Sequence, residues 1–434
     1  MQSDVTPAVT KVRWFMGRRL WTHPSLSIFA NAYISGHPEL FTGQSFIQPH
    51  KVLDSSSCHE NCAPLVGIMP AGAPQLRGLI VNTDLIGRRV KYLGNRILNV
   101  NPYFLWIVLV VFVLAKTGFR SSSLGVSTNF IPALAEMPNA TSLFQSGFGP
   151  FWLAFALGID TTREWIMMTT LILASAIALV VPLAKRQFPG NAQFALILIA
   201  ALPILSTQFS WIGMYDPFIF LGLIIWGLGR STTWWVVGAF IASSANPEQL
   251  TVAATLALLV TFTMKLSSEK RRALILLGVS IFNVAVSQLW FLLSGNSSNR
   301  SNQLGELLEP SLYSFSMYWP LYVWGIFGVL WLVVLLSVAS LQSKKSAIIS
   351  LVILVGIPLL AGAITLDGFR VLALVALPVT LLIVGNFVDS IKTNKFTAPF
   401  IAVAMLFILV IAPPAELSWP AIGPIIIDFL NQYF

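Results

Sequence analysis

Long apolar runs dominate the chain beyond residue 100, and short polar turns separate them. A membrane-spanning helix needs roughly 20 predominantly apolar residues. We predict about eleven such spans, at 103–116, 165–184, 192–210, 217–229, 232–245, 250–264, 273–293, 316–341, 346–366, 369–388 and 398–413. A further apolar stretch at 147–159 is short, which is typical of an interfacial or re-entrant helix. The pattern therefore predicts an all-α, polytopic integral membrane protein.

The first hundred residues differ from this pattern. They hold both cysteines and all four histidines, and no stretch within them is apolar for the length of a span. A basic group, Gly87-Arg88-Arg89-Val90-Lys91 with Arg96, lies directly before the first span, which indicates a signal anchor whose N-terminal side stays in the cytoplasm. We predict a basic cytoplasmic segment over 1–100, for which a partly disordered tail is one interpretation, and a multi-pass domain over 101–434 with a long loop at 117–164.

Composition supports a lipid environment. Hydrophobic residues make up 56% of the chain and charged residues 10%, with a mean hydropathy of +0.78. A soluble globular protein carries about 25% charged residues, because its surface faces water. The composition therefore excludes a soluble enzyme, a disordered scaffold and a nucleic-acid-binding module. The net charge of +9 belongs mostly to groups that flank spans, so we predict the lipid bilayer as a partner and no nucleic acid.

The basic groups also test the assignment of spans. They lie before the first span, at Lys185-Arg186, at Arg230, at Lys265 with Lys270-Arg271-Arg272, at Lys344-Lys345, and at Lys392 with Lys395. If 147–159 does not cross the membrane, all of them fall on one side, as the positive-inside rule requires of the cytoplasmic side. We therefore predict a plasma or inner membrane protein with a cytoplasmic N-terminus.

Acidic residues gather on the opposite, outer side. Eight of those beyond position 100 fall there, namely Glu136, Asp160, Glu164, Asp216, Glu248, Glu306, Glu309 and Asp367. Asp216 precedes Pro217, an arrangement typical of a helix N-terminus. However, the two runs that follow this turn, 217–229 and 232–245, each have about 13 residues, about 20 Å of helix, which is too short to cross roughly 30 Å of hydrocarbon. A carboxylate below the membrane surface is a candidate functional group.

Two further turns on this side carry candidate ligands. In the first, Asn246 and Pro247 open a helix, and Glu248 and Gln249 follow. In the second, Asp367 and Arg370 lie three residues apart. They form either a local ion pair or a phosphate site, because the planar guanidinium matches a phosphate group. We predict that the carboxylates of Asp216, Glu248 and Asp367 line one outer cavity with Arg370 at its edge.

The remaining candidates carry weaker signals. Asp160 begins the second span with an N-cap pattern, next to Arg163. The group Cys58-His59-Glu60-Asn61-Cys62 has zinc-ligand types but lacks the spacing and the second cysteine pair of a zinc site. We therefore predict no metal site and no certain cofactor.

The order of these elements resembles that of the GT-C superfamily of membrane glycosyltransferases. In that superfamily a signal anchor precedes a long outer loop with short helices, and a series of spans with short loops follows. Here the span 103–116, the loop 117–164 and the short helix 147–159 match that order. The resemblance covers roughly residues 100–415 and implies a polyprenyl-phosphate-linked sugar as donor.

The resemblance also implies roles for the outer residues. The catalytic base would be Asp216, or else Glu136, which is the first acidic residue after the first span. Cations at the phosphate and polar groups around the sugar would come from the other outer residues, which are Arg370, Arg163, Asp160, Glu248, Gln249 and Asp367. A transporter or flippase of lipid-linked material, and a non-catalytic membrane scaffold, stay open as alternatives.

Overall fold

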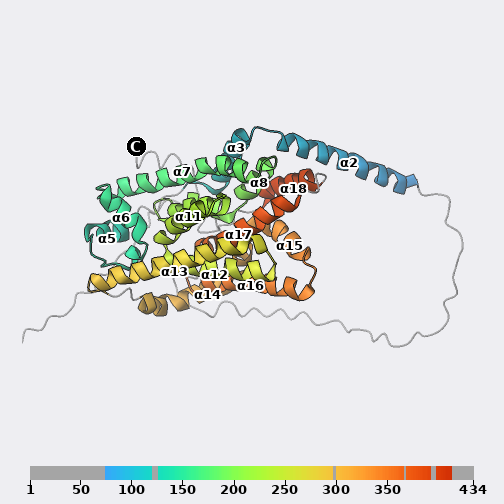
Figure 1. Ribbon diagram of the computed structural model, residues 1–434. Coiled ribbons are helices and arrows are strands. Elements are labelled where there is room, and N and C mark those ends of the chain that lie inside the picture. Colours follow the sequence, from blue (N-terminus) through green and yellow to red (C-terminus); the bar gives the residue numbers. More distant parts are fainter. Residues whose placement is uncertain (1–73, 120–125, 297–299, 366–367, 392–396, 413–434) are drawn as a thin grey trace, which may run out of the picture. The chain divides into compact units, whose positions relative to one another are not determined.

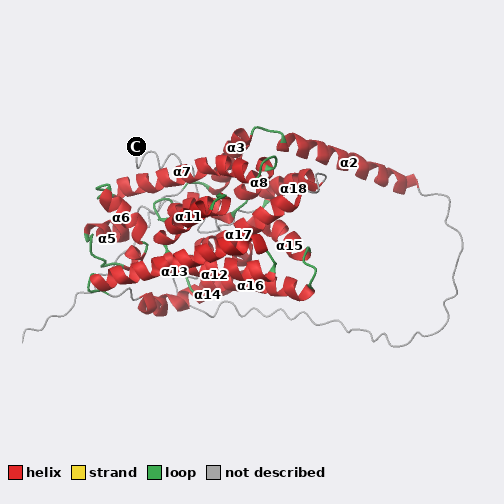
Figure 2. Cartoon of the chain, viewed as in Figure 1, coloured by secondary structure: helices red, strands yellow, loops and turns green. Residues whose placement is uncertain are grey.

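The computed structural model describes residues 74–119, 126–296, 300–365, 368–391 and 397–412. These residues form helices and connecting turns, and within the described ranges there is no strand (Figure 2). The predicted all-α class is therefore confirmed. The expectations for 1–73, including Cys58, Cys62 and His50, lie outside the described residues, as do Asp367, Lys392 and Lys395.

The helices follow one another with short connections. The first group comprises α2 (Pro74–Leu98), α3 (Pro102–Thr117), η2 (Val126–Phe130), α5 (Ile131–Ala135), η3 (Leu143–Ser146), α6 (Phe148–Ala156), α7 (Thr162–Gln187), α8 (Ala192–Ala200), α9 (Pro203–Ser210) and α10 (Asp216–Leu228). The second group comprises α11 (Thr232–Ala245), α12 (Pro247–Thr263), η4 (Ser267–Glu269), α13 (Lys270–Leu293), α14 (Arg300–Phe327), η5 (Gly328–Leu330), α15 (Trp331–Ala339), α16 (Lys344–Ala363), α17 (Gly368–Ile391) and α18 (Thr397–Ile411).

Fewer of these helices have the length of a membrane span than the hydropathy pattern predicts. Among the described residues, five are long and apolar enough to cross a membrane, at Thr162–Gln187, Ser267–Leu293, Ser311–Ala339, Lys344–Ala363 and Gly368–Ile391. Two bent pairs, α2 with α3 and α8 with α9, raise the number to seven if each pair is one span. The prediction of eleven spans is therefore wrong, because the runs in α10, α11, α12 and α18 form helices of only 13 to 17 residues.

The short helix α10 lies at the centre of the bundle. At 13 residues it is about 20 Å long, against roughly 30 Å of hydrocarbon in a bilayer. Twelve of its residues are buried, and it packs against α7, α11 and α17. In Figure 1 α7 and α13 run along opposite sides of this centre. Hydropathy alone cannot separate a helix that faces lipid from one enclosed by other helices, which explains why the run in α10 is predicted as a span.

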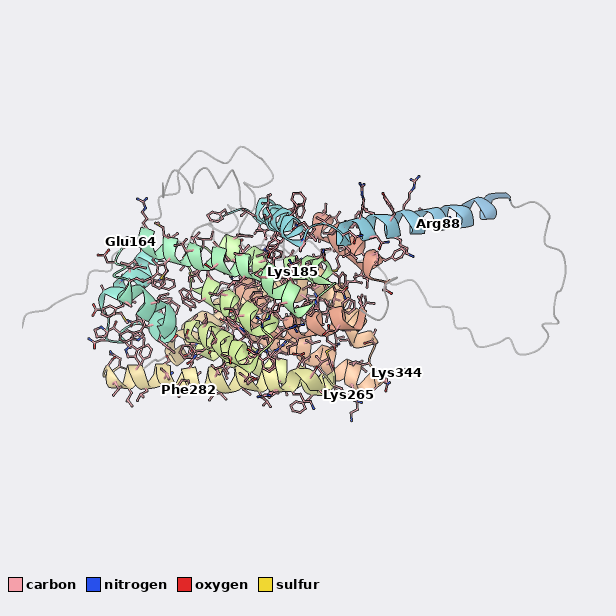
Figure 3. The ribbon with its side chains drawn as sticks, turned by 45° about the horizontal axis from the view of Figure 1, so that its top comes forward. Arg88, Glu164, Lys185, Lys265, Phe282 and Lys344 are labelled. Carbon is pink, nitrogen blue, oxygen red and sulfur yellow. The ribbon has the colours of Figure 1, made fainter. Side chains whose placement is uncertain are left out.

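The long helix α13 shows that the outer solvent is lipid. Its inward face carries Ser280, Asn283 and Ser287, each fully buried. The Asn283 Nδ2 group donates to Ser243 Oγ at 2.7 Å, and the Ser287 hydroxyl donates to the Ser146 carbonyl at 3.1 Å. Its outward face is mostly apolar, and Phe282 is 58% exposed there (Figure 3). A soluble helix has the opposite arrangement, so the described part of the chain is a membrane-embedded helical bundle.

The bundle has two chemically different ends. Glu164 lies at one end, and Lys265 and Lys344 lie close together at the other (Figure 3). We call the first the loop end, since it holds the segment 126–162 and the turns before α10, α12 and α17. The second, the basic end, holds Lys265 and Lys344 with their basic neighbours Lys270-Arg271-Arg272 and Lys345, and Arg230 follows Gly229, whose carbonyl accepts from Arg272.

The segment between α3 and α7 is pinned to the loop end by hydrogen bonds. The buried Gln145 amide donates to the carbonyls of Ala133 and Asn139, while its oxygen accepts from the Ser142 backbone at 2.8 Å. The Trp290 indole on α13 donates to the Pro138 carbonyl at 2.8 Å. Within this segment α6 has nine residues, about 14 Å, so it is too short to cross a bilayer.

Candidate functional site

A tight turn between α9 and α10 positions the central acid at the loop end. Gly213 adopts a φ of +97°, a region that favours glycine, and its carbonyl accepts a hydrogen bond from the Trp165 indole of α7 at 2.7 Å. The helix α10 then begins at Asp216, with Tyr215 at the N-cap position. The turn is thus fixed against α7. Asp216 occupies the first helical turn and not the N-cap that the Asp-Pro pattern suggests.

Asp216 pairs with an arginine that is distant in sequence. Arg370 Nη1 lies 3.5 Å from Asp216 Oδ2, and the two side chains are 11% and 3% exposed. The guanidinium carbon of Arg370 also lies 5.6 Å from the centre of the Trp211 ring, within the range of a cation–π contact. The local pairing of Arg370 with Asp367 lies outside the described residues. The structure instead joins the starts of α10 and α17 through a buried ion pair.

A third helix begins beside this pair. Asn246 caps α12 as predicted, since its side-chain oxygen accepts from the Gln249 backbone at 3.2 Å and Pro247 occupies the first turn. The Gln249 amide donates to the Val371 carbonyl at 3.5 Å, one residue after Arg370. Glu248 and Gln249 are half-buried. The positive ends of three helix dipoles, from α10, α12 and α17, therefore meet near Asp216 and Arg370, and favour negative charge there.

Aromatic rings flank the pair on both sides. Tyr215 contacts Phe130 at 5.6 Å between ring centres, and Phe130 contacts Trp165 at 5.3 Å. On α14 the buried Tyr322 contacts Phe369 at 4.5 Å, directly before Arg370. Apolar surroundings of this kind lower the effective dielectric, which strengthens electrostatic interactions between charges. Nothing in the spacing of Tyr322 or Trp211 along the sequence points to this location.

One buried amide on α9 stands out near the turn. Gln208 is 1% exposed, and neither its oxygen nor its nitrogen has a hydrogen-bond partner. It lies three residues before Trp211. A buried amide without a partner costs free energy, about 1–3 kcal/mol for each unsatisfied group. Sequence reasoning missed this residue, because a glutamine in an apolar helix gives no sign of where its side chain points.

The other candidate residues of the loop end lie apart from the buried pair. Glu136 is exposed at the end of α5. Asp160 and Arg163 are exposed at the start of α7. The N-cap of α7 is Thr161, whose hydroxyl accepts from the Glu164 backbone at 3.2 Å, so the assignment of the N-cap to Asp160 is wrong. The Glu164 carboxylate completes this capping box and accepts from the Asp160 backbone.

Two cavities lie away from the pair. An open groove of about 430 Å³ runs between α6 and α7, and its lining is apolar except for Glu164; it includes Leu153, Leu157, Met167, Met168 and Leu171. A small cavity of about 20 Å³ lies at the break between α8 and α9, beside Lys116 and Trp324. The first has the size and chemistry for a lipid chain, whereas the second has room for about one water molecule.

No metal centre is found within the described ranges, where no group of three or more His, Cys, Asp or Glu side chains is close enough to hold an ion.

Comparison with protein families, with curated proteins and with solved structures gave no match to this chain. The chemistry of the loop end must therefore be inferred from its own geometry.

Proposed function

We propose that the chain is a membrane glycosyltransferase that moves a sugar from a polyprenyl-phosphate carrier to an acceptor at the loop end. The single observation that carries the proposal is the Asp216–Arg370 pair, buried where three helices begin. Helix N-termini and an arginine are the groups with which proteins bind phosphate. The basic end would face the cytoplasm, as the positive-inside rule favours, and the loop end would face the outer side.

The geometry suggests how donor binding and chemistry are coupled. The carrier phosphate competes with Asp216 for the Arg370 guanidinium, whose planar shape suits a phosphate. Asp216, once released, acts as a general base and takes the proton of the acceptor hydroxyl. The acceptor oxygen then bonds to the anomeric carbon of the sugar. The bond from that carbon to the phosphate oxygen breaks, and polyprenyl phosphate leaves with the electron pair.

Other parts of the loop end support a lipid-linked substrate. The apolar groove between α6 and α7 has the chemistry to hold an isoprenoid chain. Glu248 and Gln249, half-buried beside Val371, are within the same region as the pair and offer hydrogen bonds to sugar hydroxyls. Glu136, Asp160 and Arg163 are exposed and would contact the acceptor or the sugar only at the mouth of the site.

The test separates phosphate binding from transfer. Purified protein in nanodiscs is titrated with undecaprenyl phosphate, and binding is followed by thermal stabilisation. We expect Arg370→Gln to weaken binding by roughly ten- to a hundredfold, since a charge-assisted hydrogen bond contributes about 1.5–3 kcal/mol. Asp216→Asn should keep or tighten phosphate binding, because it removes the competitor, yet abolish sugar transfer.

The control is the exchanged pair, Asp216→Arg with Arg370→Asp, which keeps one charge of each sign at the site. Its thermal unfolding shows whether the fold tolerates substitution at these two positions. Wild-type binding by a folded Arg370→Gln variant would overturn the proposal. Transfer by a folded Asp216→Asn variant would remove Asp216 from the role of base.

A transporter of lipid-linked material is the second candidate, and the broken helices favour it. The pair α8 and α9 bends by 53°, and discontinuous helices are common where transporters bind their substrates. The cavity at this break is only about 20 Å³, which offers no path for a sugar. Movement of a fluorescent lipid-linked sugar across proteoliposomes, without formation of a product, would favour the transporter.

A further inference from the structure

The helix α2 meets the bundle at an angle that distinguishes it from the spans. Its second half, Ile86–Leu98, forms an angle of 105° with α3. The outward residues of α3 are apolar, including Phe104 at 63% and Ile107 at 60% exposed, so α3 lies in lipid. If α3 stands along the membrane normal, α2 lies about 15° from the membrane plane (105 minus 90).

Two contacts hold the C-terminal end of α2. A Cβ atom added at Gly94 would lie 2.6 Å from the Cβ atom of Pro399 and 2.7 Å from its carbonyl carbon. Only glycine therefore allows α2 to approach the start of α18 so closely. The turn after α2 is held as well, since the Gln193 amide donates to the Val100 carbonyl at 3.0 Å. The helix thus has a defined rotation about its own axis at the basic end.

One face of α2 is apolar and extends beyond the protein that covers it. Ile86, Val90, Leu93 and Ile97 recur every three or four residues, which places them on one side of a helix. Ile97 packs against the core of the bundle. Further out, Leu93 is 49% and Ile86 is 59% exposed. The apolar stripe therefore continues where the described residues no longer cover it.

Basic residues lie on the rest of Ile86–Leu98, together with the exposed Tyr92 and Asn95. Arg88, Arg89 and Arg96 are exposed and Lys91 is half-buried. No acidic residue occurs between 86 and 98. A helix with an apolar stripe and a basic remainder is the type that lies in the interface of an anionic membrane. Lys185, at 5.1 Å from the ring of Tyr103 at the start of α3, places further positive charge at the same level.

We infer that α2 docks in the plane of the membrane on anionic lipid headgroups at the basic end, with Ile86 and Leu93 in the acyl boundary. Lipid, and not a second protein, covers the exposed part of the apolar stripe. The reason is that α3 leads directly from this helix into the bilayer, and that three exposed arginines match a negatively charged leaflet. This docking does not depend on the proposed sugar transfer.

Spin labels on the full chain test the docking. Single cysteines replace Ile86, Leu93 and Asn95 in a chain that carries Cys58→Ser and Cys62→Ser, and the protein is placed in nanodiscs of phosphatidylcholine with phosphatidylglycerol. We expect labels at 86 and 93 to collide more with oxygen, which dissolves in the acyl region, than with a water-soluble nickel chelate. The label at 95, on the opposite face, should show the reverse.

Charge variants test the dependence on anionic lipid. Near an anionic surface each basic residue strengthens attraction by roughly fivefold. Arg88→Gln, Arg89→Gln and Arg96→Gln together should therefore shift the docking equilibrium by roughly a hundredfold and remove the contrast between the labels. The matched control, Lys344→Gln with Lys345→Gln, neutralises two exposed lysines of the same end and should preserve the contrast.

Three results would overturn the inference. The first is equal access of both reagents at all three positions. The second is exclusion of both reagents from 86 and 93, which would mean that protein covers the stripe. The third is an unchanged contrast in nanodiscs of phosphatidylcholine alone, which would show that anionic headgroups play no part.

Discussion

Two largely buried arginines lie at the two ends of α10, and their hydrogen-bonding partners differ. At the basic end Arg272 is 7% exposed and donates to the carbonyls of Gly227 and Gly229 at 3.2 and 3.3 Å. At the loop end Arg370 faces the carboxylate of Asp216 at 3.5 Å. Each guanidinium also lies near a tryptophan ring, Trp235 in the first case and Trp211 in the second.

The two arginines differ in whether a ligand could replace the group that contacts the guanidinium. Arg272 also lies 3.0 Å from the Glu269 carboxylate, but both of its hydrogen bonds go to backbone carbonyls at the C-terminus of α10, where a cation also stabilises the helix dipole. These carbonyls are fixed by the helix, so Arg272 is a structural cap. The partner of Arg370 is a side chain, and another anion is able to replace a carboxylate. The same residue type is therefore a structural cap at one end and a candidate for ligand exchange at the other.

The largest effect should come from removing the carboxylate at the loop end. Asp216→Leu leaves Arg370 buried without its counter-charge, which should cost about 3–5 kcal/mol of unfolding free energy. Asp216→Leu combined with Arg370→Met should recover most of the loss, because apolar residues often replace a buried ion pair without penalty. Unfolding in mixed micelles measures both. A double variant as unstable as the single one would show that the pair does not govern local stability.

The basic end should respond differently to the same design. Arg272→Met removes two charge-assisted hydrogen bonds to carbonyls and should cost about 3 kcal/mol. Adding Glu269→Gln should not restore stability, because the carbonyls of Gly227 and Gly229 still lack donors. Glu269→Gln alone should cost less than about 1 kcal/mol, as its ion pair at 3.0 Å is partly exposed to solvent. If Arg272→Met with Glu269→Gln regained the stability lost in Arg272→Met, Arg272 would behave as a member of an ion pair, as Arg370 does.

The smallest effect should come from the tryptophans. Trp211→Leu removes a cation–π contact with Arg370 and should cost about 1 kcal/mol. Trp235→Leu should cost about 2 kcal/mol, since the indole also donates to the Gly229 carbonyl at 2.7 Å. The measurement is again unfolding in micelles. A larger loss for Trp211 than for Trp235 would indicate that the ring at the loop end has a structural role of its own.

Several features of the fold follow from the sequence alone. The hydropathy pattern correctly predicts a helical membrane protein, because lipid leaves the backbone no partner but its own helix. Local chemistry also places the start of α12, where Asn246 and Pro247 satisfy the first turn. The number of spans was not predictable in the same way. The apolar character of α10 arises from burial among other helices, and hydropathy does not distinguish a protein interior from lipid.

The sequence by itself thus determined local features, such as helix starts and single charges between apolar runs. The tertiary structure decided which of these charges contact each other. Asp216 and Arg370 stand out singly as charges between apolar runs, but their contact depends on α10 and α17 packing side by side. The local partner that the sequence offers to Arg370, Asp367, is only three residues away. Electrostatic attraction acts through space, and only the packing of helices sets which charges are close enough, in a surrounding of low dielectric, to bind each other.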